Sequence, residues 1–394
     1  MRILVAEDDL TIRTWLKIKL SKWGYEIDLA EDGEQAFALH QKHKHGLVLT
    51  DWMMPNLDGI GLIDKIRESK DQNKTYIIMI TAKQEGKDLI TGIEAGADDY
   101  IVKPVVSDEL HARLIAAERI LELERELQRQ NSSLELANAQ MKNDLIVAAR
   151  IQQSFLPHEV PQYENVSFEW GLLPCDELAG DALNVITLDE THAGFYLLDV
   201  SGHGVAAALL AMTLIHTLSA DKHNSILFEK GGNGEVQYDI RSPSKVAEVL
   251  NNNFPMDDII GQYFTFIYGV LDRSTGQVKY VSAGHPGPIQ IPVHGDPKSY
   301  PSTGMPVGFV ADSHYGEEVI NLESGDRLFF FSDGIPETVN KYGEQFGRDR
   351  LSRNLQQDKL TLRECIDNLA VAALKWNGLS LMSDDVSVVG LEFK

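Results

Sequence analysis

Residues 47–59 read LVLTDWMMPNLDG, and this stretch carries the clearest fold signal of the N-terminal part of the chain. It opens with an apolar run that ends directly on Asp51, as a buried strand followed by a polar turn does. Four similar apolar runs surround it, at residues 3–6, 25–29, 76–80 and 100–102. Amphipathic segments separate the runs. Strands that alternate with helices predict a doubly wound, five-stranded parallel sheet over residues 1–106.

Polar residues follow several of these predicted strands. Asp8 and Asp9 come after the first run, and Asp51 comes after the third. Ligands of such sheets bind at the carboxyl ends of the strands, so these carboxylates can converge on one hard cation such as Mg²⁺. Thr81 and Lys103 follow later runs. A cation and a lysine can neutralise a transferred phosphoryl group, so the set predicts a carboxylate that accepts one.

Four features occur in a fixed order: the pair Asp8-Asp9, residues 51–59, Thr81-Ala82 and Lys103-Pro104. Together they resemble the receiver domain of bacterial response regulators, and the resemblance covers nearly the whole predicted sheet domain. It implies that Asp51 accepts a phosphoryl group from a sensor histidine kinase or a phosphotransfer protein. It also implies that Thr81 and Tyr100 form a switch pair beside Lys103, and that the Lys103–Pro104 peptide bond is cis.

The resemblance further implies a Mg²⁺ ion in this domain. Asp9 and Asp51 would bind the ion directly, and Asp8 would bind it through water. Met53 would contribute its main-chain carbonyl oxygen.

Residues 107–156 are predicted to form a helical coiled-coil linker. They contain neither Gly nor Pro, and Pro157 ends the pattern. Apolar residues recur every seven positions, at Ile120, Leu127, Leu134, Met141, Ala148 and Phe155. A second row lies three residues later, at Leu123, Ala137 and Ile151, interrupted by Gln130 and Asp144. This heptad period favours a parallel homodimer, and the alternative is a single helix folded back on a domain.

Residues 157–394 are predicted to form an α+β domain, a β-sandwich flanked by helices. Strand-like runs dominate, at residues 194–200, 263–271, 278–282, 327–331 and 386–391. Helical stretches interrupt them, at residues 205–220, 244–253 and 362–376. Residues 224–239 and the Pro- and Gly-rich residues 284–308 are predicted to be irregular.

Four acidic turns lie beside strands of this domain, at Asp181, Asp199, Asp333 and the pair Asp384-Asp385. Together they could hold two metal ions between two sheets. Two metals about 3.5–4 Å apart can activate a water and stabilise the charge of a phosphoryl displacement. For each turn alone, the alternative is a structural role, because Asp and Gly favour turns.

Seven motifs of this region resemble the PPM-type metal-dependent serine/threonine phosphatases, in the bacterial branch that dephosphorylates sigma-factor regulators in sporulation and stress responses. They are residues 149–157, 180–181, 199–204, 283–286, 304–308, 331–334 and 384–387. The resemblance implies two Mn²⁺ or Mg²⁺ ions and four catalytic aspartates. The implied metal ligands are Asp181, Asp199, the carbonyl of Val200, Asp333 and Asp384. Asp385 is the less expected ligand of its pair.

The sequence departs from that family after Asp181. The family usually continues with two aromatic residues and an aspartate, whereas Ala182, Leu183 and Asn184 stand here. His203 resembles a general acid, but its spacing from Asp199 differs from that of the histidine in the eukaryotic branch, so a turn-stabilising role is expected instead. His285 lies in a Gly- and Pro-rich turn and is also expected to be structural.

Composition excludes several classes of protein. Hydrophobic residues are 43% and charged residues 24%, which is ordinary for a globular chain. No apolar run approaches the roughly 18 residues of a membrane span, and we expect a cytoplasmic protein without a signal peptide. Residues 157–394 hold 33 Asp and Glu against 16 Lys and Arg, which argues against nucleic-acid binding. Cys175 and Cys365 form neither a disulfide framework nor a zinc site.

The sequence therefore predicts a two-component response regulator. Phosphorylation of its aspartate would control a metal-dependent phosphatase that acts on a phosphorylated anti-sigma-factor antagonist. The alternative is a catalytically inactive adaptor that binds a sigma factor or an anti-sigma partner. A nucleotide-cyclising or DNA-binding output finds no support, since neither a basic recognition helix nor a glycine-rich phosphate loop is present.

Overall fold

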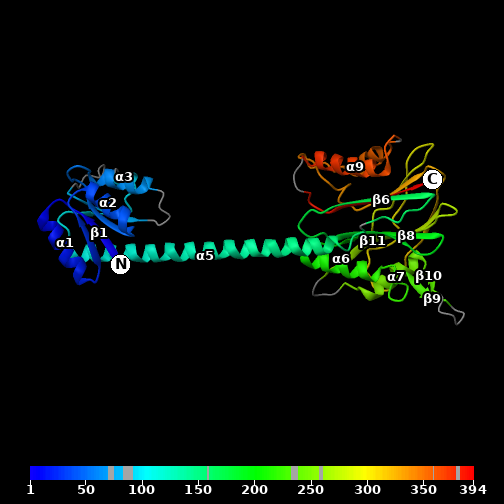
Figure 1. Ribbon diagram of the computed structural model, residues 1–394, viewed down its shortest axis with the longest axis horizontal. Helices are drawn as coiled ribbons and strands as arrows, with labels where there is room; N and C mark the ends of the chain where they lie inside the picture. Colours follow the sequence, from blue (N-terminus) through cyan, green and yellow to red (C-terminus); the bar gives the residue numbers. More distant parts are fainter. Residues whose placement is uncertain are drawn as a thin grey trace. The chain divides into compact units, whose positions relative to one another are not determined.

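The computed structural model describes residues 1–69, 75–82, 92–157, 159–231, 238–256, 261–357, 359–378 and 382–394. The chain divides into two compact units, Met1–Ala139 and Gln140–Lys394. One helix, α5 (Ser107–Gln153), contains the boundary between them. Figure 1 shows the helices and strands of each unit.

The first unit is built on a parallel sheet of five strands in the order β2-β1-β3-β4-β5. The strands are β1 (Arg2–Ala6), β2 (Glu26–Ala30), β3 (Leu47–Asp51), β4 (Tyr76–Thr81) and β5 (Asp99–Val102). The helices around it are α1 (Leu10–Lys22), α2 (Gly33–His43), α3 (Gly59–Glu68) and the first turns of α5. The predicted doubly wound sheet is confirmed.

Both faces of this sheet are buried, as its continuous apolar runs require. Successive residues of a strand point to opposite faces. Ile3 and Val5 pack against residues of α1 and α5, whereas Leu4 and Ala6 pack against residues of α2 and α3. The strands are therefore fixed on both sides, and their carboxyl ends, where the acidic residues lie, form one edge.

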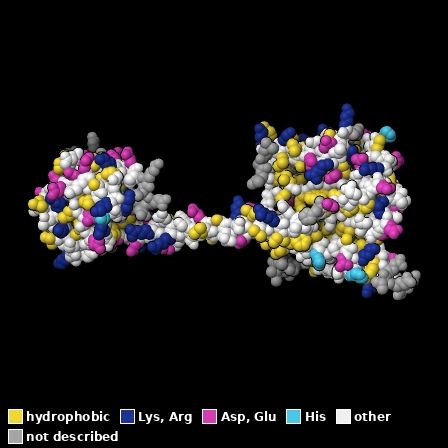
Figure 2. Space-filling view, viewed as in Figure 1, with side chains coloured by type: hydrophobic (Ala, Val, Ile, Leu, Met, Phe, Trp, Pro, Cys, Tyr) yellow, Lys and Arg dark blue, Asp and Glu magenta, His cyan; other side chains and the backbone are white. Residues whose placement is uncertain are grey.

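Helix α5 is buried against the first unit only along its N-terminal turns, through Leu110, Leu114, Ala117 and Leu121. Further along, its large apolar side chains are exposed, including those of Leu123, Leu127, Leu134, Met141 and Ile151. Figure 2 shows apolar side chains at the surface of this helix. The long helix predicted from the heptad pattern is confirmed, and its apolar row faces solvent in the single chain.

The second unit contains two five-stranded sheets, with the strand orders β15-β12-β11-β8-β7 and β14-β13-β16-β17-β6. The first sheet consists of β7 (Asp181–Thr187), β8 (His192–Val200), β11 (Phe264–Asp272), β12 (Gln277–Ala283) and β15 (Glu318–Asn321). The second consists of β6 (Val166–Leu173), β13 (Ile289–Ile291), β14 (Lys298–Ser299), β16 (Arg327–Phe331) and β17 (Val386–Phe393). All strand pairs in both sheets are antiparallel.

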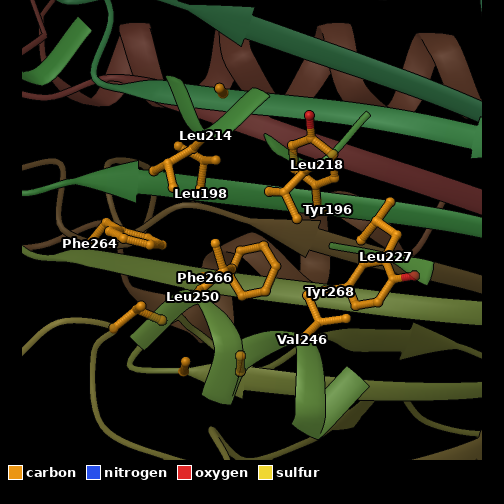
Figure 3. Close-up of a cluster of buried hydrophobic side chains, with 14 of the residues drawn as sticks. Tyr196, Leu198, Leu214, Leu218, Leu227, Val246, Leu250, Phe264, Phe266 and Tyr268 are labelled. Atoms are coloured by element: carbon orange, nitrogen blue, oxygen red, sulfur yellow. The ribbon is translucent and has the colours of Figure 1, made fainter. Parts of the chain in front are cut away.

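Helices cover the two outer faces of this sandwich (Figure 1). Helices α6 (Val205–Thr217) and α7 (Pro243–Asn253) pack on the first sheet through a large apolar cluster, part of which Figure 3 shows. Helices α8 (Gly347–Leu355) and α9 (Leu362–Trp376) pack on the second sheet. A third cluster, with Phe195, Leu197 and Phe330, fills the space between the sheets. The predicted helix-flanked β-sandwich is confirmed.

The two segments predicted to be irregular contain short strands. Strand β9 (Phe228–Lys230) lies within residues 224–239, and its partner β10 (Tyr238–Ile240) begins there; residues 232–237 of that segment lie outside the description. Strands β13 and β14 lie within residues 284–308. Strands of two or three residues are too short to show the alternation of apolar and polar residues that predicts a strand, and the many Gly and Pro residues around them predict turns.

Candidate functional site

The first acidic cluster lies at the carboxyl edge of the parallel sheet. Carboxylate oxygens of Glu7, Asp8 and Asp51 all lie within 4.8 Å of one another. The Lys103 ammonium group lies 2.8 Å from Asp51 Oδ2 and 3.1 Å from Glu7 Oε1. Asp51 is buried at the end of β3, and Asp51 Oδ1 accepts a hydrogen bond from the backbone N–H of Trp52. Three carboxylates and one ammonium group therefore share one small site.

Asp9 lies outside this cluster, and Glu7 takes the place that the sequence interpretation gave to the acidic pair Asp8-Asp9. Asp9 is the N-cap of α1, where its Oδ1 accepts hydrogen bonds from the N–H groups of Thr11 (2.7 Å) and Ile12 (3.0 Å). These backbone hydrogen bonds lower the pKa of Asp9. We therefore replace Asp9 by Glu7 in the proposed cation site, since a capping carboxylate already serves the helix.

Glu7 is fully buried, and its charge depends on its neighbours. Burial, followed by repulsion from Asp51, raises the pKa of Glu7 to about 7, although Lys103 acts in the opposite direction. A bound divalent cation favours the carboxylate form of all three acids. The donor set of hard oxygens thus fits Mg²⁺.

The other predicted residues of the first unit lie near this edge. Thr81 is buried at the end of β4, and Tyr100 is half-buried on β5 with the Arg113 guanidinium 5.7 Å from its ring centroid. The Lys103–Pro104 peptide bond is cis, as predicted. The side chain of Met53 is exposed, and its thioether is too soft a ligand for Mg²⁺, so its main-chain carbonyl is the ligand candidate.

The second acidic cluster lies at one end of the sandwich, and strand alternation places it there. Leu183 on β7 and Leu197 on β8 face the space between the sheets. Asp181 lies two residues before Leu183 and Asp199 two residues after Leu197, so both face the same space. Asp181 and Asp199 are directly opposite each other in the strand pair.

The opposite sheet supplies the other aspartates of this cluster. Asp333 follows β16, and Asp384 and Asp385 precede β17, which is the neighbour of β16. A Cβ atom on Gly334 would lie 2.0 Å from the carbonyl oxygen of Asp385, so only glycine allows these two turns to approach so closely. The sequence predicted this convergence, and the structure brings the acidic turns of both sheets together.

Repulsion between these carboxylates is not balanced by a side-chain cation. Burial, then the nearby Asp333, Asp384 and Asp385, raises the pKa of Asp199 to about 8. Burial and Asp199 hold the pKa of Asp181 well above its ordinary value, and Asp181 Oδ2 has no hydrogen-bond partner. In the described part of the chain, no Lys or Arg forms an ion pair with any aspartate of this cluster. These acids fit divalent cations that neutralise them.

Asp385 has a different role from its neighbour. Its Oδ1 accepts the N–H of Cys175 (2.8 Å), and its Oδ2 accepts the N–H groups of Gly180 (2.6 Å) and Asp181 (3.2 Å). Asp384 is more exposed, and its Oδ1 accepts the N–H of Asp385 (2.8 Å). Asp385 therefore fixes the loop before Asp181, which leaves Asp384 as the better ligand candidate.

Gln152, near the end of α5, contacts the same loop, and the sequence interpretation missed it. Its Nε2 donates to the carbonyl of Ala179 (2.6 Å), and its Oε1 accepts the N–H of Ala179 (3.0 Å). Gln152 is buried, whereas the neighbouring Gln153 is exposed. The end of α5 is thus hydrogen-bonded to the backbone of Ala179, which lies two residues before Asp181. No local pattern could have found a contact that joins residues so far apart in the sequence.

His203 lies exposed at the rim of this cluster. It stands between Gly202 and Gly204, which both have φ of 87°, and its Nδ1 lies 3.8 Å from Asp176 Oδ2. His285 is fully buried nearby.

Family models match both parts of the chain. Residues 189–394 match the family described as stage II sporulation protein E (SpoIIE). The chain belongs to the SpoIIE family. Residues 3–115 match the response regulator receiver domain, so this SpoIIE-family chain joins a receiver to a PPM-type phosphatase domain.

Two curated relatives match this chain over about the length of the receiver domain. A probable transcriptional regulator, ycf27 of Cyanophora paradoxa, is 46% identical over 113 residues, which are 29% of this chain and 46% of the relative. The transcriptional regulatory protein ResD of Bacillus subtilis (strain 168) is 44% identical over 115 residues, 29% of this chain and 47% of that protein. The chain thus spans less than half the length of these curated relatives.

The fold of the second unit has a solved counterpart. The SiaA-PP2C domain of Pseudomonas aeruginosa aligns with a TM-score of 0.53 and 17% identity, over 66% of this chain and 99% of that domain. This likeness establishes the fold of the SpoIIE-family unit. Within the described residues, none of the helices is both long and apolar enough to pass through a membrane.

Proposed function

We propose that this chain is a response regulator whose phosphorylation on Asp51 controls a metal-dependent protein serine/threonine phosphatase. The observation that carries the proposal is the second acidic cluster, in which turns from two sheets bring together aspartates without a balancing side-chain cation among the described residues. Such a cluster is costly unless cations occupy it. Its position in a SpoIIE-family domain supports phosphoester hydrolysis as the reaction.

Asp181, Asp199 and the carbonyl of Val200 would hold one Mn²⁺ or Mg²⁺ ion, and Asp333 and Asp384 would complete the shell of a second. These oxygens are spread more widely than those of the receiver site, which suits two ions better than one. When bound, the ions would supply an activated water and stabilise charge at the phosphorus. Asp385 would orient the loop that carries Asp181.

The receiver site would hold Mg²⁺ through Asp8, Asp51, Glu7 and the carbonyl of Met53. Asp51 would accept the phosphoryl group from a sensor histidine kinase or phosphotransfer protein, and Lys103 would neutralise part of the added charge. Thr81 and Tyr100 would rearrange around the phosphoryl group. This assignment rests on the match to the receiver domain and on the compact acidic cluster.

Helix α5 offers a route between the two domains. Its first turns are part of the receiver core, and Gln152 near its end holds the loop before Asp181. A displacement of α5 would move Ala179, and through Gly180 it would change the position of Asp181 relative to Asp385. Phosphorylation can shift the output only by as much as it stabilises one of the two states over the other.

The exposed apolar row of α5 supports a parallel homodimeric coiled coil. In the single chain Leu134 is exposed, so Leu134→Asp should leave each domain folded but separate the dimer. Ser133→Asp, at the neighbouring position off the row, is the matched control. Sedimentation equilibrium measures the oligomeric state of both variants. A Leu134→Asp chain that stays dimeric would show that the apolar row of α5 is not the dimer interface.

The proposed substrate is a phosphoserine or phosphothreonine on an anti-sigma-factor antagonist protein, in the cytoplasm. The resemblance to the sporulation and stress-response branch supports this choice, and the net acidity of the second domain argues against nucleic acid as a partner.

Hydrolysis of such a phosphoprotein by the full chain tests the phosphatase. We expect turnover with Mn²⁺ and none after chelation with EDTA. Absence of turnover with Mn²⁺, on a verified phosphorylated partner, would contradict an enzyme and favour a non-catalytic adaptor that binds the sigma-factor machinery.

A further inference from the structure

His285 lies between the two halves of the phosphatase site, and neither proposed metal shell uses it. It occurs where the chain crosses from β12 in the first sheet to β13 in the second, and it is 1% exposed. Gly284 before it has φ of 69°, and a Cβ atom there would lie 2.5 Å from Pro306 Cγ. The Oγ of Ser282 donates to the carbonyl of His285 (2.6 Å). The crossover is therefore held in one conformation.

On one side, His285 contacts the first sheet. Its Nδ1 lies 2.7 Å from the Oγ1 of Thr265, near the start of β11. Thr265 is directly opposite Asp199 in the β8–β11 pair. Residues directly opposite in an antiparallel pair have side chains on the same face, so Thr265 lies beside Asp199. His285 thus contacts the immediate neighbour of a proposed metal ligand.

On the other side, His285 Nε2 is buried near the backbone of Phe331 in the second sheet, without a hydrogen-bond partner among the described residues. Burial lowers the pKa of His285 to about 3, and the backbone of Phe331 acts weakly against this shift. The ring is therefore neutral, with one donor and one acceptor nitrogen. Phe331 is the last residue of β16, two residues before Asp333. Arg348 reinforces the same region, since its Nη2 donates to the carbonyl of Gly287 (2.6 Å).

We infer that His285 is a positioning residue that holds Thr265, and through it the neighbouring Asp199, and so sets the affinity of the site for its metal ions. This inference rests on the proposed function. His285 reaches from the crossover to the strand beside Asp199. Metal affinity depends on ligand positions, and outer-shell partners that orient the ligands are worth about 10–100-fold in affinity.

Two variants of nearly equal size separate positioning from packing. His285→Asn keeps a polar atom close to the position of Nδ1 and can still contact Thr265, whereas His285→Leu cannot. We expect calorimetric titration of the full chain with Mn²⁺ to show a Kd about tenfold higher for His285→Leu than for wild type. The Asn variant should bind within about threefold of wild type.

Thermal unfolding in EDTA provides the second readout. A purely structural His285 would lower the Tm of both variants and leave the Mn²⁺ Kd of the folded protein unchanged, which would overturn the inference. If His285→Leu does not fold, Thr265→Val removes the same contact from the other side and should raise the Kd similarly. An unchanged Kd in Thr265→Val would also overturn it.

The same titration separates this inference from the proposed function. A wild-type chain that binds no Mn²⁺ contradicts both. A wild-type chain that binds Mn²⁺ and hydrolyses phosphoserine, with a His285→Leu variant of equal affinity, contradicts the role of His285 alone.

Discussion

The two acidic sites of this chain differ in how their charge is balanced. In the receiver, Lys103 lies within hydrogen-bonding distance of both Asp51 and Glu7, and three carboxylates meet within 4.8 Å. In the phosphatase domain, the aspartates are spread over two sheets, and none is ion-paired with a Lys or Arg in the described residues. Burial and mutual repulsion raise the pKa of Asp199 to about 8 there.

This difference matches the two tasks. A resident ammonium group lets the receiver meet the added charge of a phosphoryl group. In a cluster without such a cation, the carboxylates repel one another until divalent ions bind. A change in the position of any one ligand can therefore change metal binding and, with it, the activity. The link from Gln152 through Ala179 to Asp181 is where we expect that control to act.

The largest effect should follow from Asp333→Asn. The change removes a charged ligand from the proposed second metal shell and should lower phosphoserine turnover by more than the roughly 100-fold that outer-shell changes reach. Asp349→Asn, an exposed position on α8, is the control. Steady-state rates of phosphoserine hydrolysis in Mn²⁺ measure the effect. An Asp333→Asn enzyme with wild-type turnover excludes the two-metal assignment.

Lys103→Met should make the receiver site resemble the phosphatase site. Without the ammonium group, Asp51 and Glu7 repel each other unopposed, and the phosphoryl analogue beryllofluoride loses a charge partner. We expect its affinity to fall by about tenfold or more, as when one partner of a buried ion pair is removed. Titration followed by tryptophan fluorescence measures this. Equal affinity would show that Lys103 does not contribute to the site.

Gln152→Ala tests the link between α5 and the phosphatase site. Loss of two hydrogen bonds of about 1 kcal/mol each should release the loop before Asp181 and weaken Mn²⁺ binding by about tenfold. Gln153→Ala changes the exposed neighbour and should bind Mn²⁺ like wild type. Calorimetry measures the Mn²⁺ Kd of both variants. Equal Kd values would show that the contact between Gln152 and Ala179 does not regulate the metal site.

The smallest effect concerns stability in the absence of metal. The pKa of Asp199 is raised to about 8, so between pH 4 and pH 8 the folded state holds a proton that the unfolded state has lost. Stability therefore falls as the pH rises through this window. In EDTA, we expect the Tm to drop by a few degrees between pH 5 and pH 8, and Asp199→Asn should show a smaller drop. A Tm that rises over this range in EDTA would contradict the raised pKa.

Much of this architecture could be predicted from local patterns. The apolar runs predicted the five-stranded sheet, the heptads predicted α5, and the acidic turns predicted which strand ends would meet. Asp9 was misplaced because three acidic residues stand in a row, and only the hydrogen bonds from Thr11 and Ile12 show which one caps the helix. The contacts of Gln152 and Asp385 join residues far apart in sequence, so no periodicity or spacing predicts them.

We propose that the receiver controls the phosphatase. The direct test is phosphoserine hydrolysis by the full chain in Mn²⁺ and Mg²⁺, with and without beryllofluoride, alongside Asp51→Asn. We expect beryllofluoride to change turnover by roughly 5–150-fold, the usual range of coupling between sites, and to have no effect on Asp51→Asn. Turnover that is identical with and without beryllofluoride in the wild-type chain, once its binding to the receiver is verified, would contradict the account.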